Sequence, residues 1–216
     1  MVSPLLSWFA GNARKLPWRD DPTAYHVWVS EIMLQQTRVE AVKPFYARFI
    51  GTLPDVKALA GCPEDQLLKL WEGLGYYNRV RNMQKAAQIA VESYDGKMPT
   101  DYGTLLSLPG IGSYTAGAVA SIAGGQAVPA VDGNVLRVIS RICGSEADIA
   151  KQSVKRGMEE TLLEVIPADA PGSFNQALME LGATVCLPNG APECSRCPAL
   201  HLCMAGKNGS WDHIPV

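Results

Sequence analysis

Apolar residues recur at helical spacing through most of this 216-residue chain, and the strict alternation of a half-buried strand is nearly absent. Glycines and prolines interrupt the pattern at short intervals, which favours short helices joined by short connections. The composition, with 47% hydrophobic and 19% charged residues, excludes a disordered or low-complexity protein. We therefore predict an all-α fold with helices near residues 5–9, 27–34, 40–50, 63–70, 80–94, 104–108, 114–123, 134–143, 153–165 and 173–185.

The charge balance and the apolar runs narrow the possible partners. The chain has 19 basic and 21 acidic residues and a net charge of −2, so the composition alone argues mildly against nucleic acid. Its apolar runs fall short of the ~20 residues that a bilayer requires, and no basic segment precedes an N-terminal apolar run. The sequence therefore predicts a cytoplasmic protein with no membrane partner.

Four of the six cysteines, Cys186, Cys194, Cys197 and Cys203, lie close together near the C-terminus. Without a secretory signal, clustered cysteines favour metal ligation over disulfides. Only one of the three gaps has the two-residue spacing of a zinc knuckle, so the pattern favours a four-iron cluster, with zinc and coincidence as the alternatives. Cys143 ends an apolar stretch and is predicted to be a buried thiol.

Residues 108–119, Leu-Pro-Gly-Ile-Gly-Ser-Tyr-Thr-Ala-Gly-Ala-Val, have the pattern of a helix-hairpin-helix. In this motif the turn at Pro109, Gly110 and Gly112 presents main-chain N–H groups that can bind one DNA phosphate without any lysine. The alternative is an ordinary helix connection closed by glycines. A phosphate contact of this kind would position the protein on DNA without reading its sequence.

Two carboxylates are candidates for chemistry. Glu31 lies on a face of its helix that is otherwise largely apolar, where burial would favour the protonated acid; the alternative is an exposed edge or a pair with Arg38 or Arg79. Asp132 precedes an apolar helix, so its default interpretation is an N-cap. As a pair, the carboxylates could cleave a glycosidic bond, one protonating the leaving group and one stabilising the sugar cation.

The segment from Trp71 to Asn82 interleaves aromatic residues, glycines and arginines. Tyr76 or Tyr77 could stack on bases or wedge between them, and Arg79 and Arg81 could bind phosphates. The alternative is a helix start with tyrosines packed in the core.

Together these segments resemble one enzyme family. Its features here are the Trp18-Arg19 pair, the Trp28–Val39 block, Gly73–Tyr77, Leu108–Gly112, Val131–Val135 and the cysteine set. They resemble the catalytic core of the MutY family of adenine DNA glycosylases, within the helix-hairpin-helix and iron–sulfur superfamily that includes endonuclease III. The resemblance covers essentially the whole chain.

The resemblance implies a fold with an active site in the cleft between two lobes. One is a six-helix lobe over residues 16–126, with the helix-hairpin-helix at about 104–123. The other is an iron–sulfur lobe formed by residues 1–15 and 127–216, with one [4Fe–4S] cluster bound by the four clustered cysteines of loop 186–203. A further domain for 8-oxoguanine recognition is expected to be absent.

The resemblance also assigns roles. Glu31 would protonate adenine, Asp132 would stabilise or capture the sugar cation, and Asn134 would orient the catalytic group. Tyr114 takes the place of a Schiff-base lysine, which implies hydrolysis without strand cleavage. The residues expected near DNA or the flipped base are Arg19, Leu34, Gln36, Tyr77, Arg79, Pro109, Gly110 and Gly112.

The implied substrate is double-stranded DNA with adenine opposite 8-oxoguanine or guanine, bound by a monomer. Two departures from the family pattern are visible: seven residues, rather than six, separate Cys186 from Cys194, and this loop lacks Lys and Arg. The alternatives are a thymine glycosylase of T·G mismatches and a non-catalytic iron–sulfur DNA-binding module. The Gln35-Gln36 pair argues against the first, and the presence of both Glu31 and Asp132 argues against the second.

Overall fold

The computed structural model describes residues 1–216, which form helices and loops with no strand. The chain divides into two compact units: unit 1 comprises Met1–Arg14 and Gly125–Val216, and unit 2 comprises Lys15–Gly124. None of the helices combines the length and the apolar character needed to cross a lipid bilayer.

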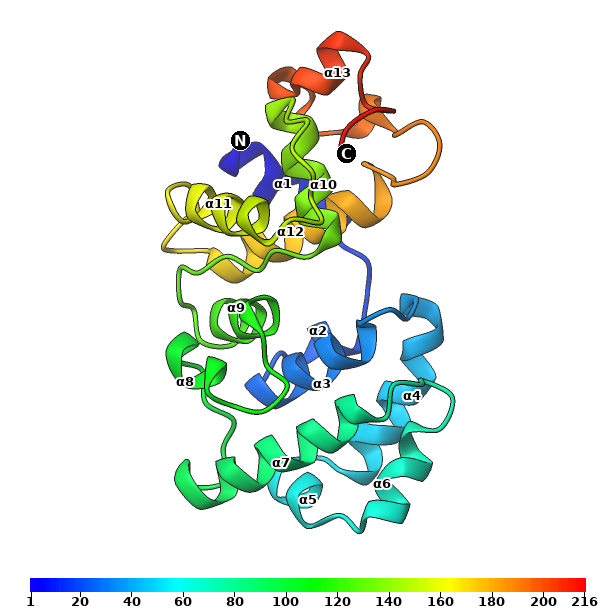
Figure 1. Ribbon diagram of the computed structural model, residues 1–216, viewed down its shortest axis with the longest axis vertical. Helices are drawn as coiled ribbons and strands as arrows, with labels where there is room; N and C mark the ends of the chain where they lie inside the picture. The colour runs from blue at the N-terminus through cyan, green and yellow to red at the C-terminus, as the bar shows by residue number, and fades with distance from the viewer. The chain divides into compact units, whose positions relative to one another are not determined.

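Figure 1 labels the α-helices in chain order. Those of unit 1 are α1 (Val2–Asn12), α10 (Gly133–Cys143), α11 (Gln152–Leu163), α12 (Pro171–Thr184) and α13 (Met204–Asn208). Those of unit 2 are α2 (Pro17–Asp20), α3 (Ala24–Leu34), α4 (Val39–Thr52), α5 (Val56–Gly61), α6 (Glu64–Trp71), α7 (Asn78–Ser93), α8 (Tyr102–Leu106) and α9 (Ser113–Ile122).

Helix α3 is the most enclosed helix of unit 2, as its dense apolar sequence predicts. It packs against α2, α4 and α9, and eight of its residues are buried. The Thr23 side chain fixes its start by accepting a hydrogen bond from the His26 main-chain N–H. Because Ala and Gly dominate the buried face of α9, its backbone can pack closely against α3.

The helix-hairpin-helix consists of α8, a turn and α9, which pack against each other. Leu108 and Ile111 are buried and anchor the turn, whereas Gly110 and Gly112 are exposed. Gly110 has a φ of +78°, in the left-handed region that favours glycine. A Cβ placed there would lie 2.8 Å from the Cβ of Asn82 in α7, so this turn requires glycine for two reasons.

Unit 1 is built around the contact between α10 and α12, with α1 packed against α12 and α13 against α10 (Figure 1). One hydrophobic cluster forms its core; among its fully buried members are Val135, Phe174, Leu178 and Leu181. Gly144, with a φ of +66°, ends α10 in the left-handed conformation typical of helix C-termini.

The predicted helices are found with boundaries shifted by up to three residues, and three α-helices were missed. The missed helices α2, α5 and α13 have four, six and five residues, which is too short for helical periodicity to be recognised. The prediction for Cys143 was wrong, because this thiol is exposed. It is the last residue of α10 and lies beyond the buried stretch that ends at Arg141.

We expect Gly110→Ala to lower the free energy of unfolding by roughly 1–3 kcal/mol, because alanine would be strained at this φ and would crowd Asn82. Chemical denaturation of the full chain measures the change. Gly61→Ala is the matched control, since Gly61 lies in a helix and a Cβ there meets nothing within 4 Å. Equal stability of the two variants would contradict the requirement for glycine at the turn.

Candidate active site and metal centre

Glu31 lies on the buried side of α3 and is 6% exposed. The alternative of an exposed edge is therefore wrong. The Tyr114 hydroxyl, from the first turn of α9, donates a hydrogen bond to Oε2 of Glu31. The close packing of α3 and α9 thus brings together two predicted site residues that are 83 positions apart. This contact fixes one oxygen of a carboxyl group that is shielded from solvent, and burial favours the protonated form of such a group.

Asp132 is the N-cap of α10, which confirms the default interpretation of this residue. One carboxyl oxygen accepts from the Val135 main-chain N–H at 2.8 Å, and the other accepts from Nδ2 of Asn134 at 2.8 Å. Burial raises the pKa of Asp132, although these two hydrogen bonds act in the opposite direction. The cap does not exclude chemistry, because each carboxylate oxygen has a further lone pair.

A hydrogen-bonded chain leads from Asp132 to the first cysteine of the cluster. The Arg137 guanidinium donates to Oδ1 of Asn134 at 2.9 Å and to the Cys186 carbonyl oxygen at 2.9 Å. It also donates to the carbonyl oxygen of Gly182 at 2.8 Å. Sequence reasoning missed Arg137, although a signal was present: Arg137 and Arg141 are one helical turn apart in an otherwise apolar helix.

Asn175 was missed as well. It is fully buried in α12, accepts from the Ala130 main-chain N–H at 3.1 Å and donates to the Val128 carbonyl oxygen at 2.9 Å. These bonds fix the extended segment that precedes Asp132. No local sequence pattern identifies this contact, because its partners are 45 and 47 positions away.

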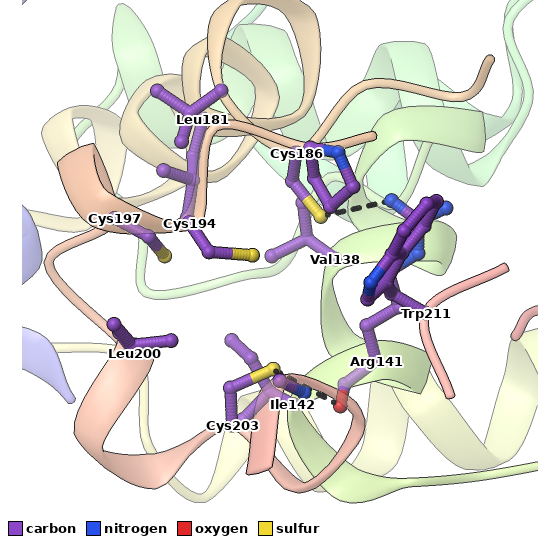
Figure 2. Close-up of a pocket in the computed structure, with 13 residues that line it drawn as sticks. Val138, Arg141, Ile142, Leu181, Cys186, Cys194, Cys197, Leu200, Cys203 and Trp211 are labelled. Atoms are coloured by element: carbon purple, nitrogen blue, oxygen red, sulfur yellow. Dashed lines mark hydrogen bonds between the residues drawn. The ribbon is translucent and has the colours of Figure 1, made fainter. Parts of the chain in front are cut away.

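The four clustered cysteines line one pocket in unit 1, and Figure 2 shows them arranged around a common space. Most of the remaining wall is apolar, with Val138, Ile142, Leu181 and Trp211 among its residues. Burial raises the pKa of the Cys197 thiol to about 11. No group of three or more His, Cys, Asp or Glu side chains is placed to hold a single metal ion. In a four-iron cluster, by contrast, each cysteine binds a different iron.

Arg141 is a buried cation beside these cysteines. Its guanidinium donates to Sγ of Cys186 at 3.4 Å (Figure 2). It also donates to the carbonyl oxygens of Leu187 and Ile214, at 2.8 and 2.7 Å. No carboxylate pairs with it. Four thiols around an apolar space, next to a buried positive charge, form a donor set that fits an iron–sulfur cluster, whose thiolate ligands are anionic.

The residues predicted to meet DNA differ in accessibility. Gln36 is exposed, whereas Arg19 in α2 and Leu34 at the end of α3 are half-buried. Tyr76 is 68% exposed and Tyr77 37% exposed, so the alternative that both tyrosines pack in the core is wrong. Tyr76 is thus the more accessible candidate for stacking on a base.

The two arginines of this segment bind protein groups. Arg81 pairs with Glu64 at 2.9 Å on the surface. Arg79 turns inward, where both terminal nitrogens of its guanidinium donate to main-chain carbonyl oxygens. The alternative of a pair between Arg79 and Glu31 is not found; Tyr114 bonds to that carboxyl group instead.

Comparisons with known proteins place these features in context. A family model described as HhH-GPD superfamily base excision DNA repair protein matches residues 29–164. The adenine DNA glycosylase of Mus musculus is 46% identical over 212 residues, which cover 94% of this chain and 41% of that protein. The adenine DNA glycosylase of Buchnera aphidicola subsp. Schizaphis graminum (strain Sg) is 38% identical over 213 residues, covering 98% and 61%. The chain therefore spans less than two thirds of the length of these relatives.

Two solved structures are similar to the chain over most of its length. A thermostable thymine-DNA glycosylase matches with a TM-score of 0.84 and 28% identity, covering 96% of this chain and 95% of that one. Endonuclease III in a non-covalent complex with DNA matches with a TM-score of 0.78 and 27% identity, covering 95% and 92%.

Proposed function

Because the chain belongs to the HhH-GPD superfamily of base excision DNA repair proteins, we propose that it is an adenine DNA glycosylase. It would hydrolyse the N-glycosidic bond of adenine opposite 8-oxoguanine or guanine in double-stranded DNA. The observation that carries the proposal is the buried Glu31 carboxyl group bound to the Tyr114 hydroxyl. The similarity to curated adenine DNA glycosylases supports adenine as the base.

In this reaction Glu31 acts as the general acid. It donates its proton to N7 of the flipped adenine, which weakens the bond between N9 and C1′ and lets the base leave as a neutral molecule. The sugar is left with oxocarbenium character, and the ionised Asp132 carboxylate stabilises or captures it. Water then supplies the hydroxyl group at C1′ and gives up a proton, which the Glu31 carboxylate accepts to restore the acid. Asn134 orients Asp132 through the hydrogen bond described above.

Tyr114 determines which product is formed. A phenol cannot form a Schiff base with C1′, so the proposed enzyme releases adenine and leaves the abasic strand uncut. DNA would be held by the main-chain N–H groups at Gly110 and Gly112, next to Pro109. Gln36 with Tyr76 or Tyr77 would occupy the space that the flipped adenine leaves, and Arg19 and Leu34 would line its pocket. The enzyme would act as a monomer in the cytoplasm, on the nucleoid if bacterial.

The four clustered cysteines would hold one [4Fe–4S] cluster, which braces the surrounding loop when bound. Arg141 would stabilise the anionic ligand set through its hydrogen bond to Sγ of Cys186. Through Arg137, the main chain of the first ligand is connected to Asn134 and hence to Asp132.

A second candidate is a thymine glycosylase of T·G mismatches. The structural similarity to a thymine-DNA glycosylase, with a TM-score of 0.84, favours it. The Gln35-Gln36 pair and the higher identity to adenine DNA glycosylases favour adenine instead. A non-catalytic binding module would require neither Glu31 nor Asp132.

Single-turnover base release tests the reaction and its substrate together. Duplexes carrying A opposite 8-oxoguanine, A opposite G and T opposite G are compared, and we expect adenine release from the first two. Glu31→Gln should lower the rate at least about a hundredfold while duplex binding stays measurable, because an amide cannot donate the proton. Glu92→Gln, at an exposed glutamate of α7, is the control. Near-normal release by Glu31→Gln would remove Glu31 from this role, and release of thymine alone would favour the second candidate.

Variants of Asp132 separate the cap from the chemistry. Asp132→Asn keeps a capping oxygen but loses the negative charge, so we expect a stable protein that releases almost no adenine. Asp132→Ala should in addition lose about 1 kcal/mol of stability. Burial raises the pKa of Asp132 above its ordinary value of 3.8, and the reaction requires the ionised form. As the pH is lowered, the wild-type rate should therefore begin to decrease above pH 3.8. An active Asp132→Ala variant would show that Asp132 only caps α10.

The metal content is a separate test. Anaerobically purified protein should be brown and contain about four irons per chain. Cys197→Ala should lose this iron, whereas Cys143→Ala should keep it, because Cys143 does not line the pocket. Stoichiometric zinc without visible absorption would contradict the assignment of an iron–sulfur cluster.

A further inference from the structure

Three exposed residues of unit 2, Gln36, Tyr76 and Asp95, adopt a backbone conformation that non-glycine residues rarely take. Gln36 has a φ of +60° and Tyr76 a φ of +47°. They lie in different loops, one after α3 and one before α7. A left-handed residue costs roughly 1–2 kcal/mol, so the surrounding structure must hold each of them in place.

Arg79 binds both loops at once. One terminal nitrogen of its guanidinium donates to the carbonyl oxygens of Ile32 and Gln35, both at 2.7 Å. The other donates to the carbonyl oxygens of Leu74 and Gly75, at 2.9 and 3.3 Å. The Gln35 carbonyl belongs to the peptide that precedes Gln36, and the Gly75 carbonyl to the peptide that precedes Tyr76. The same side chain therefore fixes the peptide plane that leads into each left-handed residue.

The position of Arg79 is itself enforced by its neighbours. Its guanidinium carbon lies 5.3 Å from the centre of the Trp71 ring and 5.7 Å from that of the Tyr76 ring. The Trp71 indole N–H also donates to the Gly75 carbonyl oxygen, at 3.0 Å. No carboxylate pairs with Arg79, and desolvation lowers its pKa. A cation that gives up water without gaining an anion needs several well-placed carbonyl oxygens to compensate.

We propose that Arg79 is a positioning residue for base extrusion. It holds Gln36 and Tyr76 as one rigid pair, so that both side chains enter the space left by the flipped adenine together. The proposal rests on the proposed function, because it requires an enzyme that extrudes its base. Only a planar fork reaches both loops; a lysine ammonium, with a single nitrogen, cannot bridge four carbonyl oxygens in this arrangement.

The test compares two substrates that differ in how much extrusion they require. One is a duplex with adenine opposite guanine; the other carries the same adenine opposite an abasic-site analogue, where it has no pairing partner. With saturating enzyme, Arg79→Lys should slow single-turnover release from the first roughly ten- to a hundredfold. Release from the second should stay within a few-fold of wild type. The matched control is Arg81→Lys, at the surface pair with Glu64, which should change neither rate.

A fluorescent base gives a second readout. With 2-aminopurine in place of the target adenine, binding of the wild type should raise its emission as the base leaves the stack. Arg79→Lys should give a smaller rise at the same bound fraction. Tyr76→Ala should show the same loss, and the Arg79→Lys, Tyr76→Ala double variant should be no worse than the single ones, because both act through the same pair.

Each outcome bears on the proposal. Equal slowing on both substrates, or wild-type rates on both, would overturn it, as would additive losses in the double variant. Thermal unfolding of the variants identifies a folding defect, and Arg79→Gln serves as the second variant if Arg79→Lys does not fold. If the wild type releases adenine from neither duplex, the proposed function fails. If the wild type is active and only the results expected for Arg79→Lys are not obtained, the role of Arg79 is overturned and the proposed function stands.

Discussion

Three arginines, two of them buried and one half-buried, bind main-chain carbonyl oxygens and hold the irregular segments on which the candidate site depends. Arg79 fixes the loops after α3 and before α7, Arg137 binds the end of α12, and Arg141 binds the segments near Leu187 and Ile214. Helix ends leave carbonyl oxygens without intrahelical donors, and buried ones need partners. A guanidinium group suits this task because its five donors lie in one plane and can serve several oxygens at once.

This use of arginine changes the meaning of the low net charge. A count of basic residues treats each one as a surface charge. These three arginines instead bind carbonyl oxygens of the protein, and Arg81 forms an ion pair with Glu64. The chain therefore presents even fewer free cations than its composition implies. The proposed DNA contact at the hairpin does not depend on them, because the donors there are main-chain N–H groups. The net charge therefore indicates neither how many cations are exposed nor whether main-chain groups can bind DNA.

The sequence predicted the helical fold and the hairpin, since apolar periodicity and the Pro-Gly-Ile-Gly turn are local signals. It also singled out Glu31, because a carboxylate on an apolar helical face is visible from spacing alone. The contact between Glu31 and Tyr114 was not predictable from spacing, since it depends on the packing of two helices far apart in the chain. The inward turn of Arg79 was missed for the same reason. In the sequence, an arginine beside tyrosines and glycines is typical of a phosphate ligand. Its bonds to the carbonyl oxygens of another loop can be seen only in the folded structure.

The two carboxyl groups differ in the hydrogen-bond donors that surround them. Glu31 is enclosed in α3 and accepts from a neutral phenol, which adds no positive charge nearby. Asp132 lies at the N-terminus of α10, where the helix dipole and two N–H donors favour a negative charge and oppose the burial that raises its pKa. Reversing the roles would require the N-cap carboxyl group to hold a proton before the reaction, which its donors disfavour. The asymmetry therefore supports Glu31 as the acid and Asp132 as the anion, since an acid and a stabilising carboxylate need environments that differ in this way.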